Sequence, residues 1–261
     1  MITVLIMYHV RRIQRDKEPK CNIEKKVLLD GKFLGYRTET FVTGPEWSLR
    51  RKRVKEALKV FRENLNKISG ERRKKYQGER PWSDHLKAAK LTQCVNENKQ
   101  FGHIPGIRIG DSFLYRAELK IIGLHCQFLN GIDYIKLPNG KTLATSIVDS
   151  GRYANDVGPS HTLIYCGHGG NPNATGKGKP NDQKLEFGNL ALKGTLEEKV
   201  PVRVIRKFQG KNSQDYKYVY DGLYVVDTFW QERGEFGKLI FKFLLKRIPG
   251  QLELNWGKFL N

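Results

Sequence analysis

Apolar residues recur at intervals of four and three positions between residues 48 and 70, and the positions between them are crowded with arginine and lysine. This spacing places a single apolar stripe along a helix. We predict that the helix has Ser48 as its N-cap and stops at Gly70. The stripe consists of Val54, Leu58, Phe61, Leu65 and Ile68.

A second helix is expected to open at Ser83, just after Pro81 and Trp82, and to run through Leu86, Ala89 and Cys94. The apolar stripe of the first helix is best explained by packing against the main domain. Coiled-coil pairing is the alternative, but the heptad pattern lasts barely two repeats. Earlier in the chain, residues 27–34 are typical of a short hairpin.

After Gly102 the pattern changes to short runs of β-branched and aromatic residues separated by turn residues. In the last run, apolar residues from Leu239 to Leu245 alternate with residues that include Lys242 and Lys246, so we expect one buried face and one partly basic face. Many short strands with few helices predict a closed or strongly curved sheet. The runs cover residues 112–125, 142–151, 161–167, 200–208, 216–226 and 237–250.

The charge of the chain indicates a polyanionic partner. Its formal net charge is +20, from 47 Lys and Arg against 27 Asp and Glu, which exceeds what solubility requires. Residues 1–100 hold 25 basic and 12 acidic residues, so the N-terminal part is predicted to offer a surface that grips a nucleic-acid backbone. For any single Lys or Arg, a solvated helix face is the alternative interpretation.

Several other classes of protein fit poorly. Four scattered cysteines indicate neither a disulfide framework nor the zinc clusters of SET or RING modules, and they favour a reducing, intracellular compartment. The apolar segment Ile2–Val10 is too short to span a bilayer. The glycine-rich segment 167–180 lacks the spacing and the Ser or Thr of a phosphate-binding loop. No histidine is followed two residues later by glutamate, which argues against a zinc deaminase.

Two tyrosines and one aspartate in residues 151–170 suggest a pocket for a flat, polar ring. Tyr153 and Tyr165 are candidate stacking plates, and the carboxylate of Asp156 could accept hydrogen bonds from the exocyclic amine of cytosine. Such a pocket would suit an extruded base. Taken alone, the tyrosines would also fit ordinary strand packing, and Asp156 would fit a turn.

A series of ordered motifs resembles the SRA-YDG (SET- and RING-associated) domain, most closely that of plant SUVH-type histone methyltransferases. The resemblance covers about residues 100–254, and the helical stretch from Ser48 is also similar to what precedes the domain in that family. The motifs are Ile104–Asp111, Gly123–His125, Asn130–Asp133, Ser150–Asp156, Asp182–Leu185, Gly188–Leu192, Val202–Arg206, Tyr220–Gly222 and Arg247–Gln251.

The resemblance implies an α+β fold, a curved and saddle-like β-barrel (SRA/PUA-like) with N-terminal helices. It also implies a domain that turns 5-methylcytosine out of duplex DNA into a pocket. In that pocket Tyr153 and Tyr165 match the stacking aromatics, Asp156 matches the carboxylate that reads the base edge, and Cys166 stands where a threonine is common. The Tyr220–Gly222 signature is expected to be structural.

Two loops complete the implied interface. Leu129 falls where a thumb loop pushes a side chain into the vacated stack, with Gln127 and Asn130 on the same loop. Residues 171–181 fall where a finger-like loop lies, and Lys177 and Lys179 are its candidate backbone contacts. Arg152 replaces a usual glycine next to the pocket and is a further candidate for contact with the backbone.

We therefore predict a non-catalytic nuclear chromatin protein that reads 5-methylcytosine in double-stranded DNA, without cofactor or metal. Histone-modifying or other chromatin proteins are further candidate partners. The alternatives are a generic basic DNA- or RNA-binding module with a decayed pocket, and a chromatin scaffold that binds protein through the helix from Ser48. The predicted divisions are an unassigned segment 1–46, a basic helical extension 47–99, the SRA-YDG domain 100–254 and a tail 255–261.

Overall fold

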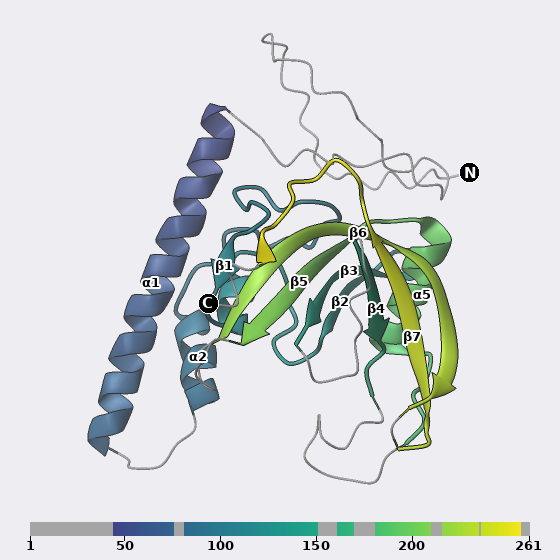
Figure 1. The fold of residues 1–261 in the computed structure, drawn as a ribbon. Helices are drawn as coiled ribbons and strands as arrows, with labels where there is room; N and C mark the ends of the chain where they lie inside the picture. Colours follow the sequence, from purple (N-terminus) through teal and green to yellow (C-terminus); the bar gives the residue numbers. More distant parts are fainter. Residues whose placement is uncertain are drawn as a thin grey trace.

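The computed structural model describes residues 44–75, 81–150, 161–169, 181–209, 216–234 and 236–256. The predicted hairpin at residues 27–34 and the apolar segment near the N-terminus lie outside these residues. Two helices, α1 (Pro45–Lys75) and α2 (Pro81–Lys90), precede a sheet. They lie to one side of the sheet, and helix α5 (Phe187–Glu198) lies to the other side (Figure 1).

The sheet is mixed and has seven strands among the described residues. Its hydrogen-bonded order is β2-β3-β5-β6-β7-β4, and β1 pairs with β6 in addition. All these pairs are antiparallel except β3 with β5, which is parallel. The strands are β1 (Ser112–Phe113), β2 (Ile132–Lys136), β3 (Thr142–Asp149), β4 (Thr162–Cys166), β5 (Val202–Gln209), β6 (Tyr216–Arg233) and β7 (Leu239–Arg247).

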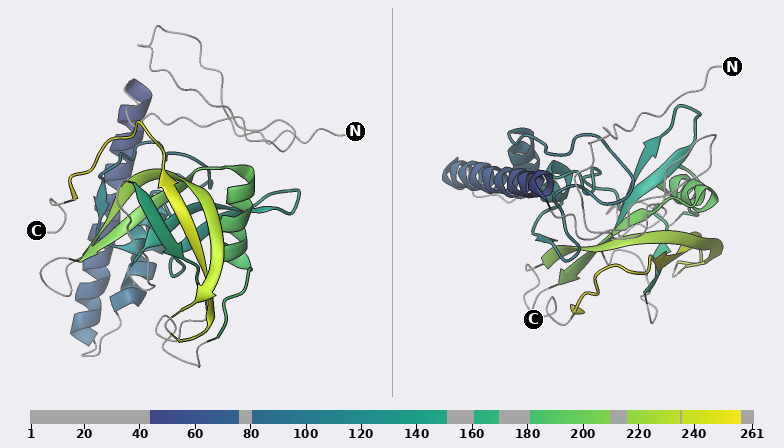
Figure 2. Two further views of the ribbon diagram at one scale, coloured as in Figure 1. Left: turned by 45° about the vertical axis from the view of Figure 1, so that its right-hand side comes forward. Right: turned by 90° about the horizontal axis from the view of Figure 1, so that it is seen from above.

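The sheet is strongly curved, as predicted, and the long strand β6 bends across the molecule (Figure 1, Figure 2). Register shifts lie between Val226 and Thr228 in β6 and between Val204 and Ile205 in β5. Such irregularities bend a strand and increase its twist. Within the described residues the sheet is not closed, because the path of paired strands ends at β2 and β4.

Five of the six predicted strand segments overlap the strands β3, β4, β5, β6 and β7, although β5 and β6 run beyond the predicted segments, and the prediction for residues 112–125 was largely wrong. Only Ser112–Phe113 is a strand, and Arg116–Ile121 forms helix α3. The local cause is Glu118, whose carboxylate accepts hydrogen bonds from the backbone N–H groups of Leu114 (2.6 Å) and Tyr115 (3.2 Å). A glutamate that reaches back to the amides at a helix start favours the helix.

The boundaries of both N-terminal helices differ from the prediction. Helix α1 begins at Pro45 instead of after Ser48, since proline is well suited to the first helical position. It also runs through Gly70, because a single glycine costs a helix only about 1 kcal/mol. Helix α2 likewise begins on its proline, two residues before Ser83, and ends before Cys94.

The predicted apolar stripe of α1 packs against the main domain, as expected. Val54 is buried with residues that precede and form α3, and Phe61 and Leu65 are buried against Ala88 of α2 and Ile121 of α3. Two ion pairs fix the helix further: Arg51 with Asp111, and the Nε of Arg62 with the carboxylate of Glu118 at 2.8 Å. The helix is therefore attached along its length, not only at its end.

Helix α5 was missed from the sequence. It packs on β2, β3 and β6, and its Ala191 and Leu192 join a core cluster that also contains Leu163 of β4 and Phe243 of β7. This cluster places α5 behind the strands that carry the candidate pocket. No helix among the described residues is long and apolar enough to cross a bilayer.

The prediction of a partly basic outer face on β7 was wrong for Lys242. This side chain is buried, 7% exposed, and its ammonium lies 3.9 Å from a carboxylate oxygen of Glu232 on β6. Strand β7 lies inside the sheet between β6 and β4, where Lys242 is paired with Trp230 of β6 and Cys166 of β4. Lys246 is exposed, as expected.

Candidate nucleic-acid interface

Tyr165 lies on β4 and is only 3% exposed. Its hydroxyl is 3.5 Å from the carbonyl oxygen of Val148 on β3 and lies against the backbone of Gly131. A Cβ atom at Gly131 would stand 2.5 Å from that hydroxyl, which is closer than atoms pack. The candidate stacking tyrosine therefore reaches the base of the predicted thumb loop, which Gly131 ends.

Cys166 follows Tyr165, is buried, and forms no disulfide among the described residues. Burial raises the pKa of this thiol, which favours its protonated form. Its sulfur lies 3.8 Å from the side-chain nitrogen of Gln183. At this position the chain offers a small, weakly polar surface next to Tyr165.

The thumb loop, residues Cys126–Asn130, carries an exposed apolar side chain. Leu129 is 71% exposed, the highest fraction among the exposed large hydrophobic residues of the described part of the chain. Beside it, the amide nitrogen of Asn130 donates to the side-chain oxygen of Gln127 at 3.4 Å. The structure thus brings together three predicted thumb residues, with the leucine pointing into solvent.

The thumb loop is held by backbone and side-chain contacts that the sequence analysis did not identify. Arg116, at the start of α3, donates to the carbonyl oxygens of Phe128 (3.3 Å), Gln127 (3.2 Å) and Asn130. The ring of His125 is fully buried and lies 3.0 Å from the same Asn130 carbonyl oxygen. No local motif would have revealed these contacts, because Arg116 is separated from the loop by a helix.

Two buried amide side chains hold the turn that follows β4. Gln183 donates to the carbonyl oxygens of Gly167 (2.7 Å) and Gly169 (3.2 Å), and its own oxygen accepts from the N–H of Phe241 at 2.9 Å. Asn189 of α5 bonds both the N–H and the carbonyl of His168, each at 3.0 Å. These residues lie in the Asp182–Leu185 and Gly188–Leu192 motifs, which signalled importance but not this role.

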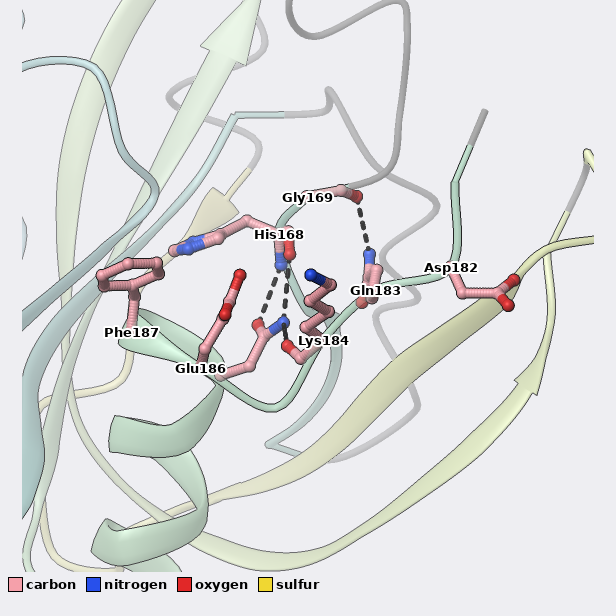
Figure 3. A pocket seen from close by; sticks show the side chains of 8 residues that line it. His168, Gly169, Asp182, Gln183, Lys184, Glu186 and Phe187 are labelled. Atoms are coloured by element: carbon pink, nitrogen blue, oxygen red, sulfur yellow. Dashed lines mark hydrogen bonds between the residues drawn. The ribbon is translucent and has the colours of Figure 1, made fainter. Parts of the chain in front are cut away.

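A pocket of about 260 Å³ opens beside this turn. Figure 3 shows His168 and Phe187 at one end of the pocket and Asp182 at the other, with Gln183 bonded to the turn. Asn189 also lines the pocket. Burial lowers the pKa of His168, which favours its neutral form. Phe187 is exposed and has a positive φ of 48°, an unusual conformation for a bulky residue.

The Tyr220–Gly222 signature has the predicted structural role. The carboxylate of Asp221, which is 1% exposed, accepts from Arg206 and from the hydroxyl of Tyr224, both at 2.6 Å. Gly222 has φ 119° and leaves no room for a side chain, because the oxygen of Gln251 would lie 2.6 Å from its Cβ. This network joins β5, β6 and the segment after β7.

The remaining predicted site residues lie outside the described residues: Arg152, Tyr153, Asp156, Lys177 and Lys179. Their roles stay predictions. The described residues fix only the two ends of the segments that carry them.

Comparison with known proteins identifies the family. The SAD/SRA domain family matches residues 100–251 of the chain. The chain belongs to the SAD/SRA family. This confirms the resemblance that the motifs indicated, and the curved sheet with N-terminal helices is the fold of the SRA domain.

Within the SAD/SRA family, the chain is 43% identical over 222 residues to SUVH5 of Arabidopsis thaliana, a histone-lysine N-methyltransferase specific for lysine 9 of histone H3. The match covers 79% of this chain and 28% of SUVH5. A YDG domain-containing protein of Arabidopsis thaliana is 41% identical over 217 residues, which cover 78% of this chain and 64% of that protein. The chain therefore spans less than two thirds of the length of either relative.

The SRA fold is also similar to a solved complex. The crystal structure of the SUVH5 SRA domain with fully methylated CG DNA superposes with a TM-score of 0.54 at 50% sequence identity. The match covers 60% of this chain and 100% of that domain. At this level of identity, the likeness extends beyond the fold to the residues that form it.

Proposed function

We propose that this SRA domain recognises 5-methylcytosine in duplex DNA by turning the base out of the helix into a pocket. The observation that carries the proposal is the contact between the end of the thumb loop and Tyr165 of the predicted pocket. An anchored loop exposes Leu129, and Gly131 at the end of that loop lies against the hydroxyl of Tyr165. The similar SUVH5 domain, which was solved with methylated DNA, supports the same conclusion.

In this proposal each predicted residue has one task. Tyr153 and Tyr165 stack on the two faces of the extruded base, Asp156 accepts from the cytosine amine, and Cys166 lies beside the base. Leu129 fills the gap in the stack, flanked by Gln127 and Asn130. Basic side chains bind phosphates without reading sequence. They are Arg152, Lys177 and Lys179.

We further propose that the chain acts in the nucleus, since the similar SUVH proteins are histone methyltransferases, and that it is a non-catalytic reader, since its match is to the SAD/SRA domain. The SRA domain would occupy residues 100–254, and the segment 47–99 would be an extension packed on it. Duplex DNA is the proposed main partner, with chromatin proteins as further partners.

The test is a competition titration with matched duplexes that differ only in cytosine methylation, at a fixed salt concentration. Asp156→Ala should abolish most of the preference for the methylated duplex and leave affinity for the unmodified duplex nearly unchanged, because phosphate contacts supply the background. Asp227→Ala is a matched control, since it also removes one carboxylate, at an exposed position far from the predicted pocket in sequence. Equal loss on both duplexes would instead assign Asp156 a role in folding.

The competing interpretation is a generic basic DNA- or RNA-binding module. It predicts that the wild-type chain binds methylated and unmodified duplexes equally at every salt concentration. A preference of severalfold for the methylated duplex would exclude it. Burying one methyl group contributes only about 0.8 kcal/mol, roughly fourfold, so a preference far above tenfold would require easier extrusion of the base as well.

A further inference from the structure

We propose that Arg116 is the positioning residue of the thumb loop. It holds the loop backbone in the shape that exposes Leu129, so base extrusion depends on Arg116 while initial contact with DNA does not. This inference rests on the proposed function for its consequence in DNA binding. The claim about the loop itself can be tested in the free protein.

The guanidinium of Arg116 acts as a hub for the loop carbonyls. Its Nε donates to the Phe128 oxygen at 3.3 Å, and one terminal nitrogen donates to the Gln127 oxygen at 3.2 Å and to the Asn130 oxygen. Three carbonyls within four consecutive residues therefore point inward at one cation. The loop must curl around it, which leaves the side chain of Leu129 outside.

A buried histidine supports the same carbonyl from the other side. The Nε2 atom of His125 lies 3.0 Å from the Asn130 oxygen, and its Nδ1 atom lies 2.8 Å from the hydroxyl of Ser146 on β3. Nε2 also lies 3.3 Å from a terminal nitrogen of Arg116, so the ring contacts both the carbonyl and the guanidinium that binds it. The loop is thereby attached to the sheet as well as to α3.

The two ends of the loop are tied together by Asp133 on β2. One carboxylate oxygen accepts from the N–H of Cys126 at 2.7 Å, and the other accepts from the ammonium of Lys99 at 2.6 Å. Arg116 takes no part in this contact between Cys126 and β2. Removing the guanidinium should therefore loosen residues 127–130 without releasing Cys126.

The arginine itself starts from a rigid base. It is the first residue of α3, whose start is fixed by the buried carboxylate of Glu118. That carboxylate also accepts from Arg62 of α1. A planar guanidinium can address several carbonyls in different directions, whereas the single ammonium of lysine cannot span them. Arg116→Lys therefore keeps the positive charge but removes the set of hydrogen bonds to the loop carbonyls.

The first experiment measures hydrogen exchange of the backbone amides of residues 127–130 in the free protein. Arg116→Lys and Arg116→Gln should speed exchange at these amides by tenfold or more, without changing exchange in β5 or β6. Lys120→Gln is the matched control, because Lys120 is an exposed cation on the same helix. If exchange at residues 127–130 is unchanged in both Arg116 variants, the inference is overturned, regardless of what the protein binds.

The second experiment places 2-aminopurine beside 5-methylcytosine in a duplex and records its fluorescence at saturating protein. Wild type should brighten the probe when the neighbouring base leaves the stack, and Arg116→Lys should reduce this brightening severalfold, as should Leu129→Gly. Affinity for the unmodified duplex should stay within about twofold. Full brightening with Arg116→Lys would overturn the role in extrusion.

The two experiments distinguish a failure of this inference from a failure of the proposed function. If wild type neither brightens the probe nor prefers the methylated duplex, the proposed function fails, and the exchange experiment alone decides the role of Arg116. If Arg116→Gln instead weakens binding to all duplexes and reduces the salt slope by about one, Arg116 is a phosphate contact and the inference is wrong.

Discussion

At the scale of single residues, the contact between Gly131 and Tyr165 links the thumb loop to the pocket. Gly131 has no conformational need for glycine, since no positive φ is found there, so only the space occupied by the tyrosine hydroxyl excludes a side chain. Gly131 and Tyr165 therefore form a tight steric contact. Its contribution to stability can be measured with two substitutions, one at each residue.

Gly131→Ala should destabilise the protein by about 1–3 kcal/mol, because a methyl group must be forced into a closed site. Tyr165→Phe removes the hydroxyl and should restore most of that loss when combined with Gly131→Ala. Urea unfolding of the four proteins gives the coupling. If the stability changes of the two single variants simply add in the double variant, the tight contact between the two residues is contradicted.

A second glycine provides the control for that series. Gly70 lies within α1, and no neighbouring atom lies within 4 Å of the place that an added methyl group would occupy. Gly70→Ala should stabilise the protein by about 0.5–1 kcal/mol, because alanine favours the helix. A loss of stability at Gly70 would mean that the surroundings of this site are not open.

His125 makes stability depend on pH. Its pKa is lowered to about 3, chiefly by burial and then by the neighbouring Arg116 guanidinium. Between about pH 6.5 and pH 3 the unfolded chain therefore takes up a proton that the folded protein does not. Since the unfolded state binds more protons, stability falls as the pH falls, by up to about 1.4 kcal/mol per pH unit from this group.

His125→Gln should remove that part of the slope when unfolding free energy is measured from pH 7 to pH 4.5. His161→Gln is the matched control for the loss of a histidine at an exposed position. The neighbouring Asp133 also has a lowered pKa, but it titrates below this window. An unchanged slope in His125→Gln would show that the ring is accessible to protons in the folded protein.

At the scale of elements, one buried carboxylate contributes to the attachment of α1. Glu118 is fully buried, and Arg62 is the cation that faces it. Arg62→Met should destabilise the protein by about 1–3 kcal/mol, because a buried charge loses its charged partner. Thermal or chemical unfolding measures the loss.

Lys59→Met serves as the comparison on the same helix. The Lys59 ammonium lies 3.9 Å from Glu63, and both side chains are exposed. Exposed pairs of this kind contribute about 0.3–0.5 kcal/mol, so this substitution should have almost no effect. Equal losses for Arg62→Met and Lys59→Met would contradict the special role of Glu118.

Much of the sheet could be predicted from the sequence, because the runs that form β3 to β7 combine β-branched residues with clear turns. The helix α3 could not, since its buried residues Ala117, Leu119 and Ile121 alternate like those of a strand. What decides the helix is a glutamate that binds backbone amides, and period-two patterning does not reveal this. The boundaries of α1 and α2 depended on prolines, which are compatible with a helix only at its start.

The candidate site was also predictable in part. Tyr165 and Leu129 were found through motifs, and the structure places the thumb and the tyrosine in contact through Gly131. Arg116, Gln183 and Asn189 were not assigned any role, because their contacts join segments that are distant in sequence. Such supporting contacts depend on the fold, which a single sequence does not display.

At the scale of the whole molecule, the excess of positive charge has two separable roles. A general field attracts DNA, whereas direct phosphate contacts release counterions and set the salt dependence of binding. The screening length at physiological salt is only about 8 Å, so a distant cation contributes little to binding. The position of a charge should therefore matter more than the total of +20.

Two double variants of equal charge distinguish these roles. Lys177→Gln with Lys179→Gln removes two cations from the predicted finger loop, and Lys52→Gln with Lys55→Gln removes two exposed cations from α1. If the finger loop binds phosphates, the first variant should lower the slope of log affinity against log salt by about 1.8 and the second should leave it nearly unchanged. Fluorescence titrations between about 50 and 200 mM salt supply the slopes. Equal reductions of the slope in both variants would mean that α1 binds DNA as well. The ratio of affinities for methylated and unmodified duplexes should stay constant in both variants, because phosphate contacts carry no information about the base.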